Sequence, residues 1–124
     1  AGAGVIVIQA AATTAAMTLG ISIYALTTKR DFSGIGSYLF FGLLAIIAAS
    51  IVGIFIQSSI LQLGIGVAGA VLFSLFLLYD IRQARNVEDT LPNAILVTIG
   101  IYLSVLNLFL SLLRIFGFLG SSDE

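Results

Sequence analysis

Asp80 is the residue of this sequence whose type and position most clearly invite chemistry. It is the first charged residue after the uncharged segment 32–79, and two basic residues, Arg82 and Arg85, follow it closely. One interpretation is a solvated aspartate at a membrane surface, loosely paired with these arginines, which stabilises the fold little. The other is a carboxylate held among helix ends, where it responds to protons or binds a cation. The residues alone leave both interpretations open.

The last apolar segment carries a second set of candidate residues, a stripe of small and polar side chains. On a helix that turns about 100° per residue, its members fall within roughly 60° of one direction. They are Asn93, Gly100, Ser104, Asn107, Ser111 and Arg114. The stripe predicts either a seam of hydrogen bonds between helices or one wall of a hydrophilic path. Asn107 is the strongest single candidate, because an amide with donors and an acceptor needs partners inside a membrane.

The composition excludes several kinds of site. The chain has no cysteine and no histidine, which removes disulfides, thiol chemistry, the usual zinc sites and the Ser-His and Cys-His pairs of nucleophilic catalysis. It has no phosphate-binding loop of the G-x-x-x-x-G-K-[ST] type. Its five basic residues are too few and too scattered to bind nucleic acid. We therefore predict no enzyme, no catalytic residue, no resident metal and no cofactor.

These side chains must be positioned by helices that cross a lipid bilayer. The chain of 124 residues is 60% hydrophobic and 9% charged, whereas an ordinary soluble domain is about 25% charged. Its mean hydropathy is +1.19. A transmembrane β-barrel is disfavoured, because the apolar runs do not alternate with polar residues as barrel strands do. The composition therefore predicts an all-α integral membrane protein.

The positions of the charges divide the chain into spans. Residues 1–28, 32–79 and 90–113 are uncharged. A spanning helix needs roughly 20 apolar residues, so the first and last gaps each hold one span and the middle gap holds two. The sequence predicts a single transmembrane domain over residues 1–124. Its four transmembrane helices are expected at about 4–27, 35–56, 61–81 and 93–117.

Lys29, Arg30 and Asp31 form a charged motif in the loop between the first two predicted helices. Two spans separate this loop from segment 82–92, so both lie on the same side of the membrane, and together they hold four of the five basic residues. The opposite loop, at 57–62, holds none. Basic residues mark the cytoplasmic face. Loops 28–34 and 82–92 are therefore predicted to be cytoplasmic.

Two further patterns concern the bundle as a whole. Gly64 and Ala68, and then Gly66 and Ala70, lie four residues apart, and small residues at this spacing let helix backbones approach closely in lipid. The chain begins with Ala-Gly-Ala-Gly and without a methionine. We expect from this start that the chain is a fragment with further helices upstream.

Three segments resemble the Bax inhibitor-1/YccA-like family, also called the transmembrane Bax inhibitor motif family. Residues 22–33, SIYALTTKRDFS, are similar to its Y-x-x-T-[TS]-[KR]-[KR]-D-[FLM]-S motif. Residues 78–80, LYD, are similar to its Y-D at the end of the sixth helix. Residues 101–117, IYLSVLNLFLSLLRIFG, are similar to its closing Y-L-[DS]-x-x-N-L-F-x-x-L-L-R-[IF]-[FL]-G. The order and spacing also match, and the resemblance covers nearly the whole chain.

The resemblance implies a seven-helix bundle with a cytoplasmic N-terminus, in which the predicted spans are the last four helices. Family members are implicated in calcium leak across membranes and in control of cell death or stress. Bacterial YccA-like members are associated with the membrane-bound AAA protease FtsH, which they modulate. In the calcium-leak members, two aspartates form a proton-sensitive latch.

Asp80 matches one aspartate of that latch, but Ser104 stands where the second is expected. Two neighbouring carboxylates perturb each other's ionisation strongly, and a serine beside one carboxylate lacks that effect. The substitution weakens the expectation of a latch of the family's type and favours the YccA-like branch. Asp80 is then left to bond with Ser104 or to pair with Arg82 or Arg85.

Two functional hypotheses follow. The first is a protein of the bacterial inner membrane that modulates an FtsH-type AAA protease, or a stress response, through helix contacts. The second is a pH-sensitive calcium leak lined by the last helix, with Asp80 at its cytoplasmic mouth and Ser104 and Asn107 along the path. A small multidrug transporter is disfavoured, since those proteins look to need a glutamate in their first span and residues 1–28 contain no acid.

Overall fold

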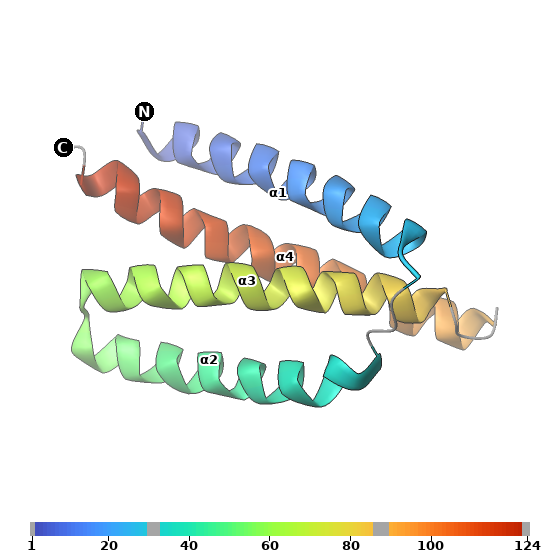
Figure 1. Ribbon diagram of the computed structural model, residues 1–124. Coiled ribbons are helices and arrows are strands. Elements are labelled where there is room, and N and C mark those ends of the chain that lie inside the picture. Colours follow the sequence, from blue (N-terminus) through green and yellow to red (C-terminus); the bar gives the residue numbers. More distant parts are fainter. Residues whose placement is uncertain (1, 30–32, 86–89, 123–124) are drawn as a thin grey trace.

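The computed structural model describes residues 2–29, 33–85 and 90–122, and these form a bundle of long helices (Figure 1). A short 3₁₀ turn, η1 (Ser33–Ile35), precedes the second helix. The helices are α1 (Gly2–Thr27), α2 (Gly36–Ile56), α3 (Ser59–Ala84) and α4 (Leu91–Ser122). All four contain segments that are long and apolar enough to cross a membrane. The predicted all-α membrane fold with four transmembrane helices is therefore confirmed.

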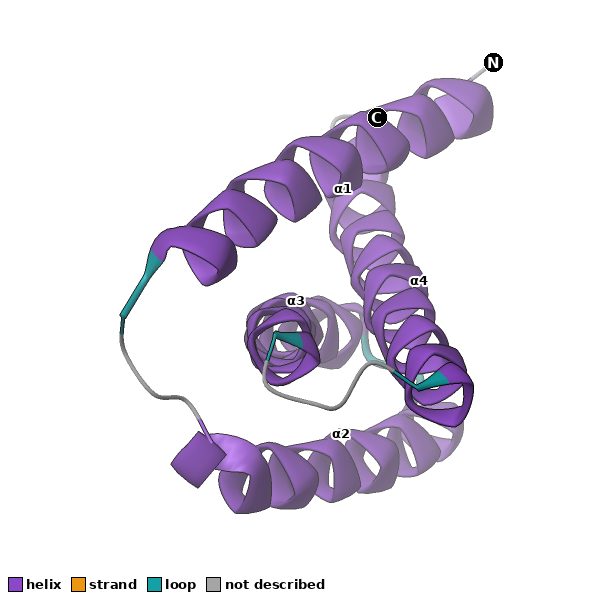
Figure 2. Ribbon diagram, turned by 90° about the vertical axis from the view of Figure 1, so that its right-hand side faces the viewer, coloured by secondary structure: helices purple, strands orange, loops and turns teal. Residues whose placement is uncertain are grey.

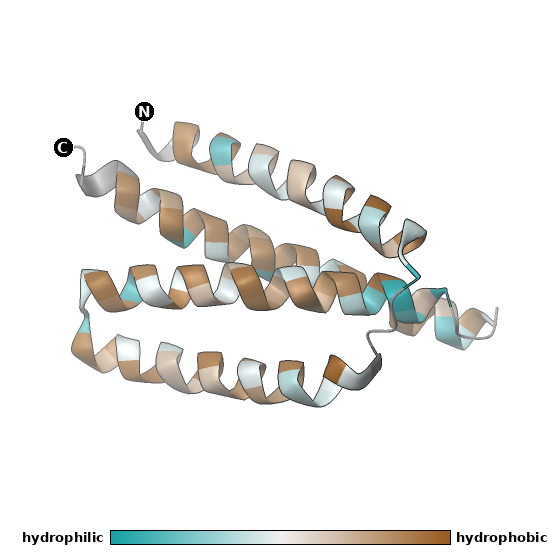
Figure 3. Cartoon of the chain, viewed as in Figure 1, coloured by the Kyte–Doolittle hydropathy of each residue, from teal (hydrophilic) through white to brown (hydrophobic). Residues whose placement is uncertain are grey.

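The surface of the bundle is what a bilayer requires. At most 33% of the most apolar window of any spanning helix is buried inside the bundle, so most apolar side chains face outward. Exposed Phe55, Ile54 and Tyr38 are examples. In water such a surface would be unfavourable, whereas hydrocarbon tails solvate it. Figure 3 shows apolar colouring along all four helices on the visible side, interrupted by a few hydrophilic patches, and hydrophilic colouring at the end where α3 stops.

The structure extends the third and fourth predicted helices. Helix α3 begins at Ser59 instead of 61 and continues to Ala84, so part of the predicted loop 82–92 is helical. Helix α4 begins at Leu91 instead of 93 and continues to Ser122 instead of 117. The predicted bounds were set by hydrophobicity, which stops where the hydrocarbon stops. Helical hydrogen bonding continues into the interface, because water and headgroups satisfy its last polar groups.

Local capping decides where these two helices start. Gln57 adopts a left-handed backbone conformation (φ 54°) that ends α2. The Ser58 hydroxyl then accepts a hydrogen bond from the Leu61 amide at 3.3 Å, which is typical of an N-cap residue. The Thr90 hydroxyl accepts from the Asn93 amide at 3.4 Å in the same way. Pro92 stands in the first turn of α4, where its missing N–H leaves no bond unmade.

Helix α3 lies at the centre of the bundle. It packs against α1, α2 and α4, and its contact with α4 is the most extensive. Figure 2, a view along the bundle, shows α1 and α2 on opposite sides of α3. In the described helices, no Cα atom of α2 lies within 8 Å of one in α4. Helix α2 therefore leaves a gap beside α4 that side chains must line.

The connections lie at two ends of the bundle, as the charge pattern predicted. Helix α1 ends and α2 begins at the end of the bundle where α3 ends and α4 begins, whereas α2 ends and α3 begins at the other end (Figure 1). At the first end, the Arg85 guanidinium donates a 3.3 Å hydrogen bond to the carbonyl of Ala25, which joins the ends of α3 and α1. The two segments predicted to be cytoplasmic therefore share one side.

Two small apolar clusters fill the interior. One is centred on Phe73, Leu108 and Leu112, and the other on Ala25, Leu77 and Ile81. Leu77 and Leu108 are completely inaccessible to solvent. Both clusters join α1, α3 and α4, so these three helices form the packed part of the bundle and fix the relative positions of the polar residues that face one another across α3 and α4.

Candidate functional site

The carboxylate of Asp80 and the hydroxyl of Ser104 meet between α3 and α4. The Ser104 hydroxyl donates a 2.7 Å hydrogen bond to Oδ2 of Asp80. Ser104 is 5% exposed, whereas Asp80 is half-buried near the end of α3. The structure thus brings together the two residues that correspond to the latch pair. The bond to Ser104 was one of the alternatives predicted for Asp80, and it favours an acid held among helix ends over a solvated one.

Glycine on α4 leaves room beside this carboxylate. A Cβ atom built on Gly100 would lie 3.7 Å from Cγ and Oδ2 of Asp80, which is ordinary contact distance. Any larger side chain at this position would grow toward the carboxylate. Gly100 and Ser104 are one helical turn apart and present the same face to Asp80. This part of the predicted polar stripe on α4 therefore packs against the carboxylate of Asp80.

Asp80 also opens onto a small cavity between α2, α3 and α4, which we call the Asp80 cavity. Its volume is about 250 Å³. Its polar lining comes from Asp80, Ser104 and Asn107, and Gly100 also borders it. Its apolar lining is Leu43, Phe73, Phe76 and Leu103. The three predicted site residues therefore share one cavity.

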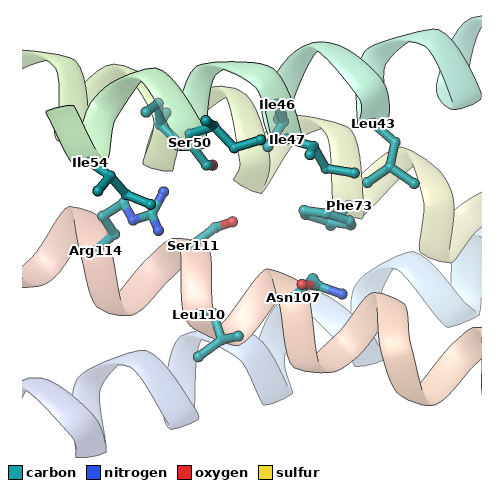
Figure 4. A pocket seen from close by; sticks show the side chains of 12 residues that line it. Leu43, Ile46, Ile47, Ser50, Ile54, Phe73, Asn107, Leu110, Ser111 and Arg114 are labelled. Carbon is teal, nitrogen blue, oxygen red and sulfur yellow. The ribbon is translucent and has the colours of Figure 1, made fainter. Parts of the chain in front are cut away.

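A larger opening, the Arg114 crevice, lies between α2 and α4 and has a volume of about 410 Å³. Figure 4 shows side chains of α2 and α4 directed into it from opposite sides. Leu43, Phe73 and Asn107 line both the crevice and the Asp80 cavity, so the two spaces adjoin. The polar residues of the crevice are Ser50, Asn107, Ser111 and Arg114. Together the two spaces follow the polar stripe of α4 from Ser104 to Arg114.

Asn107 lies where the two spaces meet, and its side-chain hydrogen bond stays within its own helix. Its side-chain amide donates to the carbonyl of Leu103 on its own helix at 2.8 Å. That bond satisfies the nitrogen within α4, and the residue lines both spaces. Ser111, in contrast, packs directly against Gly69 of α3. The stripe thus contacts α3 at Ser104 and Ser111, and all three residues, Asn107 included, also border the two spaces.

Several hydroxyl groups elsewhere in the bundle bond to their own helix. Thr14, Ser74 and Thr98 each donate to the carbonyl four residues earlier, at 2.6–2.7 Å. This arrangement satisfies a hydroxyl in lipid without any partner helix. Ser104 instead reaches across to a charged residue. The difference identifies the Ser104–Asp80 bond as a specific contact between α3 and α4.

The charged loop motif contributes less to the described structure. Lys29 is exposed after the end of α1. Arg30 and Asp31 lie outside the described residues, so their predicted placement in this loop stays a prediction. Ser50 was missed in the sequence, although a hydroxyl in the middle of the apolar run of α2 was a signal that could have identified it. Its approach to the α4 stripe depends on how α2 is rotated, which the single sequence does not specify.

Replacing Ser104 tests whether the contact with Asp80 stabilises the bundle. We expect Ser104→Ala to lower the free energy of unfolding in detergent by about 0.6–2 kcal/mol, since membrane hydrogen bonds average about 0.6 kcal/mol and bonds to charged groups are stronger. Ser74→Ala is the matched control, because the Ser74 hydroxyl bonds within its own helix at 2.6 Å. Equal losses for both variants, measured by denaturant titration, would contradict a specific role for the Ser104 bond.

The four spanning helices and the buried polar contact between them define a polytopic α-helical membrane protein. Residues 1–121 match the family described as "Inhibitor of apoptosis-promoting Bax1". The chain belongs to this family, the Bax inhibitor-1 family, as its three motifs indicated. The family assignment covers the site, because Asp80, Ser104 and Asn107 all lie within the matched residues.

Bacterial relatives agree with this assignment. The chain is 40% identical over 119 residues to a membrane protein of Vibrio cholerae, covering 96% of this chain and 52% of the relative. It is 40% identical over 121 residues to a protein of Pseudomonas aeruginosa, covering 97% and 53%. It is 36% identical over 113 residues to the inner membrane protein YbhL of Escherichia coli K12, covering 84% and 48%.

Two statements follow from these relatives. The chain spans about half the length of the curated proteins that it matches. The membrane-spanning helices, together with relatives described as a membrane protein and an inner membrane protein in bacteria, place it in a bacterial inner membrane. The predicted localisation is confirmed at this level. The assignment of loops 28–34 and 82–92 to the cytoplasm continues to rest on the charge distribution.

Proposed function

We propose that this protein is a passive calcium leak whose path follows the polar stripe of α4, with Asp80 at its cytoplasmic mouth. The observation that carries the proposal is the carboxylate of Asp80, which is held by Ser104 at 2.7 Å and faces a cavity. That cavity adjoins the Arg114 crevice, a mainly apolar space to which Ser111 and Arg114 of the same helix contribute polar side chains. The two adjoining spaces follow the polar stripe of α4, and this continuity favours the leak over protease modulation, the first hypothesis from the sequence.

The chemistry of the lining suits a hard divalent cation that passes without being retained. Carboxylate, hydroxyl and amide oxygens are the ligands that Ca²⁺ prefers, and tight sites use six to eight of them. Among the described residues, no group of three or more acidic side chains is gathered in one place. Asp80 therefore supplies one charged carboxylate. A single carboxylate can raise the local concentration of cations at the mouth of the path, but it provides too few oxygen ligands to bind a calcium ion tightly. Conduction requires binding of this weak kind.

The leak is expected to depend on pH through this single carboxylate. Protonation removes the negative charge that attracts cations, so flux falls on acidification. The response should be that of one titrating group, because Ser104 occupies the position of the second latch aspartate and has no acid to contribute. A two-carboxylate latch would give a steeper response. The shape of the pH profile therefore distinguishes this protein from the calcium-leak members that its sequence resembles.

Modulation of a membrane AAA protease is the second candidate function. The observation that favours it is the neutral hydroxyl of Ser104, which bonds to Asp80 at the position where the latch has its second aspartate. Asp80 and Ser104 therefore do not form the pair of acids that a latch of the family's type requires. A protein that acts through helix contacts with a protease needs no continuous path and no titrating pair. This function predicts co-purification with the protease from detergent extracts and altered turnover of the protease's membrane substrates.

Calcium entry into proteoliposomes is the test that separates the two functions. The complete protein encoded by the gene is reconstituted in pure lipid with a calcium-sensitive dye inside, and entry is followed on both sides of neutral pH. A leak gives entry above that of empty liposomes, and entry falls at acidic pH. Entry equal to that of empty liposomes at every pH would refute the leak and leave protease modulation as the remaining function.

A further inference from the structure

Asp80 and Arg114 border the two adjoining spaces at opposite ends, and the proposed function assigns no role to Arg114. Its side chain lines the Arg114 crevice together with Ser50 and Ile54 of α2. Figure 4 shows the guanidinium directed from α4 into the crevice toward α2. None of the side chains that line the crevice is acidic. Among the residues that the structure describes, the crevice therefore contains a fixed positive charge with no acidic side chain in its lining.

The depth of Arg114 places this charge at a mouth of the path. Helix α2 has 21 residues, which at about 1.5 Å per residue matches a hydrocarbon core about 30 Å thick. Ile54, which borders the same crevice, lies one turn or less from the end of α2 at Ile56. Along α4, Ser104 and Arg114 are separated by about 15 Å of helix axis. The two charged residues thus mark opposite ends of the adjoining spaces.

We propose that Arg114 limits the rate of the leak: its charge at the far mouth forms an electrostatic barrier to the entry of divalent cations. This inference rests on the proposed leak function. A guanidinium stays charged at every physiological pH, so the barrier is permanent. Transport proteins use arginines in this way to exclude cations from a pore. A calcium ion that approaches from the far side meets Arg114 first and is attracted by Asp80 only after passing it.

An arginine near a membrane surface is often only an anchor whose side chain extends to the headgroups. The residues that line the crevice indicate that Arg114 also faces the path. An anchor on the lipid-facing side of α4 would not share a cavity with Asn107 and Ser111, which lie on the polar stripe. The two roles also differ in what they predict. Loss of an anchor affects insertion and stability, whereas loss of a barrier raises the rate of calcium entry.

The test compares calcium entry into proteoliposomes for the complete protein and three variants. Arg114→Gln removes the charge and keeps a polar side chain of similar reach, whereas Arg114→Lys keeps the charge. Arg85→Gln is the matched control, since it removes one positive charge at the other end of the bundle, where Arg85 bonds to the carbonyl of Ala25. Iodide entry is measured in the same vesicles, so that a non-selective defect in the bilayer is recognised.

Arg114→Gln is expected to raise calcium entry roughly fivefold, because a unit charge several ångströms from a divalent ion raises its energy appreciably even in water. Arg114→Lys and Arg85→Gln should remain close to the wild type, and iodide entry should not rise. Unchanged calcium entry in Arg114→Gln, with a measurable wild-type leak, would overturn the role of Arg114 and leave the leak itself intact. No entry in either protein would overturn both proposals. Equal rises in calcium and iodide would also overturn the barrier.

Discussion

Calcium entry through the reconstituted protein should fall at least about tenfold in Asp80→Asn, because the change removes the charge that concentrates cations at the mouth. Asparagine has nearly the same shape, and its side-chain oxygen still accepts the hydrogen bond that Ser104 donates at 2.7 Å. The fold and the cavity should therefore be preserved while the negative charge is lost. The residual entry of this variant should no longer change with pH.

A second, conservative variant of Asp80 serves as the control for this result. Asp80→Glu keeps the carboxylate and lengthens it by one methylene, which the Asp80 cavity of about 250 Å³ has room to accept. It should retain most of the calcium entry and the dependence on pH. If Asp80→Asn conducts as well as the wild type at every pH, Asp80 has no role in the path. If both variants lose entry equally, the exact geometry matters more than the charge, and the electrostatic argument fails.

The sequence was sufficient to predict which helices cross the membrane and which residues share the polar face of α4. The uncharged gaps placed the four spans, because a charge in hydrocarbon is costly and each connection carries polar residues. Helical periodicity placed Gly100, Ser104 and Asn107 on one face of α4, because the side-chain types along one helix specify its faces. The resemblance to the family's latch pair, and not local geometry, made Ser104 one of the possible partners of Asp80.

The gap between α2 and α4 could not be predicted in the same way. Whether Ser50 faces α4 or lipid depends on the rotation and tilt of α2, and these are set by packing against α3 rather than by any periodicity in α2 itself. Asn107 illustrates the same limit. Its polarity predicted a partner inside the membrane, but its choice of the carbonyl of Leu103 over another helix follows from the space beside it. Cavities arise where helices do not pack against each other, whereas the pattern of apolar and small residues in a sequence mainly indicates the faces that do pack.

The close packing of α3 against α4, which holds Asp80 opposite Ser104, should depend on Gly66. A Cβ atom at this position would lie 3.0 Å from Cγ1 of Ile115 and 3.3 Å from the backbone oxygen of Ser111. The backbone atom has no rotamer by which to move away, so a larger side chain must push the two helices apart. Small residues at such positions are what allow membrane helices to approach closely. Gly66→Leu is therefore expected to separate α3 from α4 along the polar stripe.

We expect Gly66→Leu to lower the free energy of unfolding in detergent by about 1–3 kcal/mol, as overpacking of a close contact does. It should also reduce calcium entry, since the alignment of Asp80 with Ser104 depends on the same interface. Gly64→Leu is the control in the same helix, because Gly64 is exposed and a Cβ atom there meets nothing within 4 Å. Denaturant titration of the two variants isolates the interface from helix propensity, which is identical for both changes. Similar losses of stability would show that the α3–α4 contact is less tight than the structure indicates, and that Asp80 is positioned by something other than this interface.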